Sequence, residues 1–186
     1  MTERPILFSA PMVRAILAGT KTQTRRVAKH PLAQNLSYIV DIGKGWFGDE
    51  EGEVQIRCPY GQPGDRLWVR ETFAIVPRTA YRCSEGVQQT LRPDDDHDAA
   101  IYREGWTRSR GGFRWRPSIH MPRWASRITL EVTGVRVETL GIISHEDALA
   151  EGVSSIEEYK ALWININGAW LPETWVWVVD FRMVLN

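Results

Sequence analysis

Residues whose types and spacing could do chemistry concentrate at positions 19–26, where the sequence reads Gly-Thr-Lys-Thr-Gln-Thr-Arg-Arg. Lys21 stands three residues before Thr24, and a lysine whose pKa is lowered by burial can take the proton of a nucleophilic threonine hydroxyl. Arg25 and Arg26 carry planar forks of N–H donors that suit phosphates and oxyanions. The same residues could equally form a solvent-exposed basic turn, so the choice depends on the rest of the chain.

Arginine is unevenly distributed along the 186 residues, although 23 basic and 23 acidic residues balance overall. Residues 102–127 contain seven arginines and a single acid, whereas residues 138–158 contain six acids and no Lys or Arg. Arg123 and Trp124 are neighbours, a combination that single-stranded nucleic-acid binders use for stacking. We therefore regard both as candidate nucleic-acid contacts, with packing in the core as the alternative for Trp124. A GC-rich genome would also produce an arginine excess.

Several classes of protein are not indicated. Cys58 and Cys83 lack the spacing of metal ligands, so we expect free thiols, no metal site and no cofactor. The acidic run at residues 94–98 could hold a cation, but an exposed acidic loop is the more frequent outcome. The sequence shows no signal peptide and no apolar run of transmembrane length, which predicts a cytoplasmic protein without membrane contact.

The elements that must position the candidate residues are short. Alternating, β-branched or aromatic patterns predict strands at residues 5–8, 66–73, 127–137 and 174–185, with strand-like pieces at 80–83 and 100–106. Ser9 precedes a helix that Gly19 ends. Ser144 and Ser155 are each followed three residues later by an acid, which predicts helices over 144–151 and 155–166.

Residues 28–62 and 77–116 show no clear period, and we interpret them as two long insertions. The predicted strands outnumber the helices and lie far apart in the sequence. This pattern indicates an α+β, mainly β fold, with short helices packed at the ends of a small β-barrel. Without an internal repeat or a flexible linker, residues 1–186 are predicted to form a single domain.

Three ordered segments, residues 16–26, 63–71 and 176–181, resemble the ASCH domain, a member of the PUA-like superfamily of small β-barrels. Residues 116–128 resemble the longer ASCH proteins of phages and prophages. The matching segments cover about half of the chain, and three in the same order are hard to obtain by chance. The resemblance implies a PUA-like barrel that recognises RNA, single-stranded nucleic acid or a modified nucleoside, in a bacterium or a phage-infected host cell.

One ASCH branch hydrolyses the amide of acetylated cytidine with a threonine, a lysine and a glutamate. The resemblance places these roles on Thr24 as nucleophile, Lys21 as base, and Glu151 as the group that positions the lysine or carries its proton to the leaving amine. Arg26, with Arg25 beside it, would bind an oxyanion or a pyrimidine carbonyl. That branch is compact, whereas this chain has two long insertions, which leaves its substrate open.

Other interpretations remain for these residues and for the function. Glu151 could be a surface acid at the end of a helix. Glu71 could point into the same pocket or form a structural ion pair with an arginine. The pocket could bind a ligand without turnover, or the barrel could serve phage assembly or host interaction. The sequence does not distinguish polymer from free nucleoside, the modified base or the oligomeric state.

Overall fold

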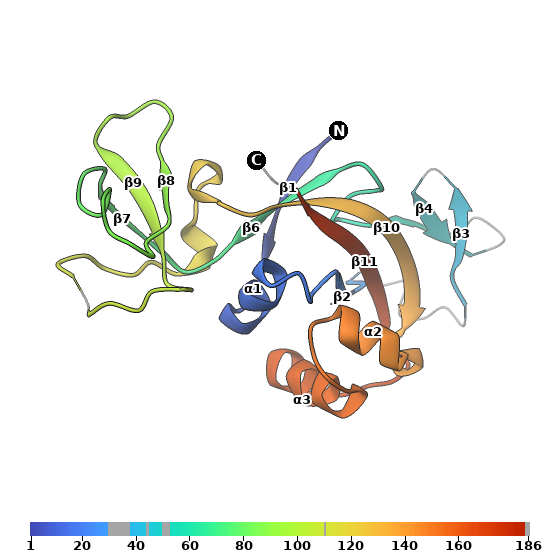
Figure 1. Ribbon diagram of the computed structural model, residues 1–186. Helices are drawn as coiled ribbons and strands as arrows, with labels where there is room; N and C mark the ends of the chain where they lie inside the picture. The colour runs from blue at the N-terminus through green and yellow to red at the C-terminus, as the bar shows by residue number, and fades with distance from the viewer. Residues whose placement is uncertain (30–37, 44, 50–52, 110, 185–186) are drawn as a thin grey trace.

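A computed structural model describes residues 1–29, 38–43, 45–49, 53–109 and 111–184. Its centre is a five-stranded sheet with the strand order β1-β6-β10-β11-β2 (Figure 1). β1 and β6 are parallel, and the other neighbouring strands are antiparallel. The strands are β1 (Glu3–Leu7), β6 (Arg66–Arg70), β10 (Thr129–Thr139), β11 (Trp175–Val184) and β2 (Gln23–Val27). The structure is therefore mainly β, as predicted.

β10 and β11 are the longest pair of strands and organise the core. Their pairing places the two predicted strands, residues 127–137 and 174–185, side by side in one sheet. Both faces of β11 are buried, because alternate side chains enter two different clusters. Trp177 and Phe181 pack on the face that β1 and α1 (Ala10–Leu17) cover. Val176 and Val178 pack against α2 (His145–Ala150) and α3 (Ile156–Asn167).

The predicted small β-barrel is not confirmed, because the residues that the structure describes form no closed barrel. β1 pairs only with β6, and β2 only with β11, so the sheet is open at both of these strands. The chain between them forms α1 and turns back at residues 18–22, so β1 and β2 do not meet as neighbouring strands. Side chains close the interior instead, with the rings of Phe8 and Phe181 6.1 Å apart. The free edge of β2 is therefore available to form a site.

The three predicted helices are confirmed, with boundaries that shift by one or two residues. α2 spans His145–Ala150, and the Ser144 hydroxyl accepts a hydrogen bond from the Asp147 N–H. α3 spans Ile156–Asn167, and its Ser155 cap accepts from the Glu158 N–H. The 3₁₀ segments are η2 (Ser118–His120), η3 (Arg123–Ala125) and η4 (Leu140–Ile142). None of the described helices is long and apolar enough to cross a membrane.

Two small sheets, built mostly from the two regions without a clear period, lie on opposite sides of the central sheet (Figure 1). One consists of β3 (Val40–Gly43), β4 (Trp46–Gly48) and β5 (Gln55–Arg57). The other consists of β7 (Phe73–Pro77), β9 (Asp98–Tyr102) and β8 (Gln89–Leu91). The predicted strand 66–73 is divided between β6 and β7, and residues 80–83 form turns rather than a strand. The single-domain organisation with insertions stays a prediction.

Candidate functional site

Lys21 reaches the interior because the chain after α1 lies against the end of α2. Lys21 and Glu151 form an isolated antiparallel backbone bridge, and the Thr22 N–H donates to the Ala150 carbonyl at 2.8 Å. Gly152 permits this close approach. It has a φ of +85°, and an added Cβ would lie 2.9 Å from the Ala15 Cβ and 3.1 Å from the Lys21 Cβ. The predicted lysine and glutamate are thus brought together.

The Lys21 ammonium is enclosed by oxygen atoms. Its Nζ donates to the Glu151 Oε2 at 2.6 Å, to the Glu151 carbonyl at 2.9 Å and to the Gln23 carbonyl at 2.8 Å. The side-chain exposure is 0% for Lys21 and 2% for Glu151. All three N–H donors of a protonated lysine are therefore used. To act as a base, Lys21 must first lose a proton, and the Glu151 carboxylate is in position to accept it.

Burial lowers the pKa of Lys21 from its usual value of 10.5. The charge of Glu151 and its hydrogen bond act in the opposite direction, while the guanidinium groups of Arg26 and Arg25 add to the lowering. For Lys21 to act as a base, the lowering of its pKa by burial must outweigh the raising by the Glu151 carboxylate, and it does so here. It makes a neutral Lys21 easier to reach than in water.

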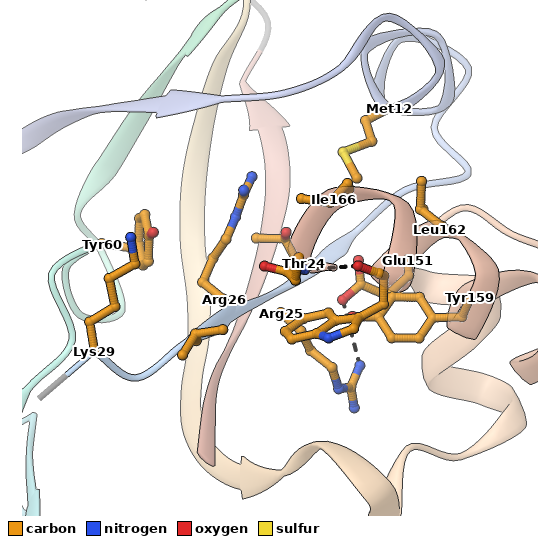
Figure 2. Close-up of a pocket in the computed structure, with 13 residues that line it drawn as sticks. Met12, Thr24, Arg25, Arg26, Lys29, Tyr60, Glu151, Tyr159, Leu162 and Ile166 are labelled. Carbon is orange, nitrogen blue, oxygen red and sulfur yellow. Dashed lines mark hydrogen bonds and ion pairs between the residues drawn. The ribbon is translucent and has the colours of Figure 1, made fainter. Parts of the chain in front are cut away.

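Thr24, Arg25 and Arg26 lie on the edge strand β2, whereas the sequence interpretation placed them in a loop. β11 needs a second hydrogen-bonding partner, and residues 23–27 supply it, with Thr24 opposite Val179. The strand sends Arg25 and Arg26 to opposite sides (Figure 2). The Arg26 Nη2 donates to the Leu7 carbonyl at 2.6 Å, and its guanidinium lies 5.2 Å from the Phe8 ring centroid.

Arg25 is held by acidic side chains rather than left open for a phosphate. Its side chain has no exposure, and its Nη2 lies 3.0 Å from Asp147 and 3.3 Å from Glu138. Its Nη1 lies 3.7 Å from the Glu151 Oε1 and also contacts Gln23. Burial acts to raise the pKa of Asp147, but hydrogen bonds from Ser144 and the charge of Arg25 outweigh it and lower the pKa. Arg25 therefore connects α2 to β2 behind the Lys21–Glu151 pair.

A cavity of about 150 Å³ lies along the free edge of β2, and we call it the central pocket (Figure 2). Thr24, Arg25, Arg26 and Glu151 line it, but Lys21 does not. α3 contributes one face at helical spacing. The remaining lining residues are Met12, Val27, Lys29, Tyr60, Tyr159, Leu162, Trp163, Ile166 and Asn167.

Three polar atoms of residues lining the central pocket are buried and have no hydrogen-bond partner among the described residues. They are the Glu151 Oε1, the Arg25 Nε and the Arg26 Nε. A buried polar atom without a partner is costly, and such atoms at a cavity are typical of a site that a ligand completes. The central pocket thus offers one carboxylate acceptor and two guanidinium donors.

The remaining predicted site residues lie outside the central pocket. Glu71 forms a buried bidentate pair with Arg127 at 2.8 and 2.9 Å, which is the ion-pair alternative. Burial raises the pKa of Glu71 and outweighs the effect of Arg127. Arg123 pairs with Glu3 at 2.8 Å on the surface. Trp124 packs against the hydrophobic cluster around Phe73, and this packing is the alternative that we gave to nucleic-acid contact.

The sequence interpretation missed the α3 residues of the pocket. Tyr159 and Trp163 were visible as part of a helix, and the i, i+3, i+4, i+7 and i+8 spacing of residues 159–167 would have identified a single face. Burial raises the pKa of Tyr159, so its hydroxyl stays protonated. The described part of the chain contains no group of His, Cys, Asp or Glu residues that could hold a metal ion.

Comparison with known proteins places this geometry on a known fold. No family model matches the sequence, and a search of curated proteins also finds no match. Among solved structures, an ASCH domain from Lactobacillus crispatus aligns over 100% of this chain and 81% of its own, with a TM-score of 0.50 and 11% identity. A protein from Enterococcus faecalis aligns over 99% and 81%, with a TM-score of 0.44 and 11% identity. The alignment with the Lactobacillus crispatus structure shows that the chain has the fold of an ASCH domain.

Proposed function

We propose that the central pocket binds the base of a modified pyrimidine nucleoside and that the protein hydrolyses an acyl amide on that base. One observation carries the proposal. Glu151 offers one carboxylate oxygen to the buried Lys21 ammonium at 2.6 Å, and its second oxygen, 3.7 Å from the Arg25 Nη1, accepts no hydrogen bond among the described residues and belongs to a pocket that Thr24 also lines. A carboxylate and a hydroxyl nucleophile thus line one cavity, and the lysine that exchanges a proton with the carboxylate is buried next to it.

The volume of the pocket supports a ligand with a single ring. An engineered protein cavity of about 150 Å³ holds benzene, and the central pocket has a similar volume of about 150 Å³. A pyrimidine ring is of benzene size, so the ribose would lie at the mouth of the pocket. A free nucleoside, or one nucleotide turned out of a strand, meets this requirement.

The three pocket atoms that lack a hydrogen bond support a base that carries a hydrogen-bond donor beside an acceptor. The exocyclic N–H of a cytosine-type base would donate to the Glu151 Oε1, and a ring nitrogen or carbonyl would accept from the Arg25 or Arg26 Nε. The aromatic side chains of Tyr159 and Trp163 would contact the ring. This set of contacts gives a hydrogen-bond partner to the Glu151 Oε1 and to one of the two arginine Nε atoms at the pocket.

The proposed reaction follows from these positions. Lys21 first transfers a proton to Glu151 and becomes neutral; the Thr24 hydroxyl then gives its proton to Lys21 as its oxygen forms a bond to the acyl carbon. Glu151 passes its proton to the exocyclic nitrogen as the C–N bond breaks, which releases the base as an amine. Water then hydrolyses the ester on Thr24 to a carboxylic acid and restores the hydroxyl. Arg26 would bind the oxyanion formed in both halves.

Binding without turnover is the second candidate, and one observation favours it. The three N–H donors of Lys21 are all satisfied, which stabilises the charged form and holds the lysine as a structural cation. In that case the central pocket would recognise a modified base through Glu151 and the two arginines. The protein would bind the same ligand but would not hydrolyse it.

Turnover of N4-acetylcytidine by Thr24 variants separates the two candidates. Wild type and Thr24→Ser should release cytidine and acetate, measured by chromatography, because both carry a hydroxyl nucleophile. Thr24→Val, which keeps the shape of the side chain, should abolish turnover and still bind the nucleoside in a calorimetric titration. Binding by wild type without any turnover would establish the second candidate. If neither binding nor turnover occurs with any acylated pyrimidine nucleoside, both candidates are wrong.

A further inference from the structure

A second hollow is lined by residues of the segment that follows β9, and it shares no lining residue with the central pocket. It measures about 520 Å³, within the range of about 300–1,000 Å³ that ligand sites occupy. Its described lining combines guanidinium groups with indole rings and includes no acidic side chain. The lining residues are Arg103, Arg108, Arg114, Trp106 and Trp115. We call this surface the arginine–tryptophan hollow.

The tryptophan rings are held in place by other aromatic rings. The Trp106 and Trp115 centroids are 5.6 Å apart with an interplanar angle of 77°, and Phe113 lies 5.3 and 5.0 Å from them in edge contacts. Tyr81 completes the group at 5.2 Å from Trp106. Both tryptophans are only partly buried. Rigid, partly exposed rings of this kind are suited to stacking with a planar ligand.

The arginines of the hollow carry uncompensated charge. Arg103 and Arg114 are exposed and form no ion pair among the described residues. Within the described part of the chain, Arg108 donates only to the backbone carbonyl of Glu85, at 3.0 Å. The acid next in sequence, Glu104, is engaged by Arg14 at 2.9 Å. The hollow is thus locally cationic although the chain as a whole has no net charge.

The guanidinium groups and the indole rings are interleaved. The Arg103 guanidinium lies 5.8 Å from the Trp115 ring centroid. The Trp106 indole N–H is buried and has no acceptor among the described residues, although Trp106 lines the hollow. A ligand with both an anionic group and an aromatic ring would satisfy guanidinium, ring face and indole donor together.

We propose that the arginine–tryptophan hollow binds single-stranded nucleic acid, with phosphates on Arg103, Arg108 and Arg114 and an unpaired base on the tryptophan rings. A duplex does not fit this chemistry, because its base faces are already stacked and unavailable. An acidic peptide would use the arginines and could accept from the indole N–H, but its acidic side chains would leave the ring faces without a stacking partner. This site goes beyond the proposed hydrolysis and requires neither Thr24 nor Lys21.

The test is fluorescence anisotropy of a short, labelled oligo-dT over a range of salt concentrations. Wild type should bind at low salt, and its affinity should fall as salt rises because phosphate contacts release counterions. The double substitution Arg103→Gln and Arg114→Gln should reduce the slope of log affinity against log salt by about 1.4, at ~0.7 per phosphate contact. Arg182→Gln is the matched control, since it removes an exposed arginine of the central sheet that pairs with Glu131.

Two further ligands distinguish the kind of partner. An abasic oligonucleotide of the same length should bind at least about fivefold more weakly, because the stacked base is lost. Polyglutamate should fail to displace the oligo-dT. Thr24→Val should still bind the oligo-dT, and the double arginine variant should still hydrolyse free nucleoside. The two assays therefore test the nucleic-acid site and the hydrolytic site independently.

The proposal is overturned by absence of binding at low salt, or by equal effects of the double variant and Arg182→Gln. Equal affinity for the abasic strand, or displacement by polyglutamate, would also overturn it and indicate a site for acidic peptides or polyanions. Both substituted side chains are exposed, so the variants should unfold at the wild-type temperature, and circular dichroism checks this.

Discussion

The Lys21 Nζ and the Glu151 Oε2 lie 2.6 Å apart inside the protein, although 130 residues separate them in the sequence. The same two residues form a backbone bridge, so their side chains and their main chains join the end of α1 to the end of α2. Arg25 lies 3.7 Å from the other carboxylate oxygen of Glu151. This arrangement places a buried ion pair at the floor of the candidate site and determines the predictions that concern it.

Breaking the pair from one side should be costly. Glu151→Gln leaves the buried Lys21 ammonium without its counter-ion and should lower the free energy of unfolding by about 3–5 kcal/mol. Lys21→Met combined with Glu151→Leu removes both charges and should recover most of that loss. Urea denaturation measures both. A single substitution that leaves stability unchanged would show that the pair is not buried as described.

The pH dependence of turnover should report the pKa of Lys21. Because the proposed first step moves a proton within the Lys21–Glu151 pair, the active form retains that proton, and kcat/KM should fall as the pH rises through the lowered pKa of Lys21, with its half-maximum below pH 10.5. Arg26→Gln removes a positive charge that lowers the pKa, so the midpoint should move to higher pH. Lys21→Arg cannot lose its proton and should show no turnover at any of these pH values. Full activity of Lys21→Arg would contradict the assignment of the base.

Filling the central pocket should block the ligand without unfolding the protein. Leu162 lines the pocket from α3 and is partly exposed, so Leu162→Trp should reduce nucleoside affinity while the melting temperature changes little. Ile164→Trp is the control, because Ile164 lies on the same helix, is exposed and does not line the pocket. Calorimetric titration and thermal melting measure the two quantities. Equal affinity of both variants would place the nucleoside elsewhere.

The ion pair between Glu71 and Arg127 should contribute to folding and not to the site. The side chains are 4% and 7% exposed, so Glu71→Gln should cost about 3–5 kcal/mol of stability. The pair of Glu3 and Arg123 is 37% and 42% exposed, and Glu3→Gln should cost no more than about 1 kcal/mol. Denaturant titration compares the two. At temperatures where Glu71→Gln is folded, its nucleoside affinity should equal that of wild type, and a selective loss of affinity would return Glu71 to the site.

Gly152 should tolerate no side chain. Gly152→Ala combines strain at positive φ with contacts of 2.9 and 3.1 Å to Ala15 and Lys21, and should destabilise the fold by more than about 1–3 kcal/mol. Gly19→Ala is matched, because its φ is +74° but an added Cβ meets nothing within 4 Å. The difference between the two variants in urea isolates the steric contribution. Equal losses would show that the approach of α2 to Lys21 is not tight.

Local patterns in the sequence determined the helices, the long strands and the chemical types at the site. Ser144 and Ser155, each with an acid three residues later, start α2 and α3, because capping depends on neighbouring residues alone. The apolar alternation after residue 174 predicted β11, because a strand has a period of two. Lys21, Thr24 and Glu151 were identified by residue type and by resemblance, and their catalytic roles stay predictions.

Only the tertiary structure decided which of these residues meet and what surrounds them. Residues 19–26 look like a basic turn by composition, but residues 23–27 form an edge strand because β11 requires a hydrogen-bonding partner. The open sheet, in place of the predicted barrel, depends on contacts between distant segments that no local pattern encodes. Arg25 and Arg26 are adjacent in sequence, yet a strand directs them to opposite faces, so one binds carboxylates and the other lies over Phe8. Pairing across 130 residues is a property of the packed core, whose burial fixes both the partner of Lys21 and the direction of its pKa shift.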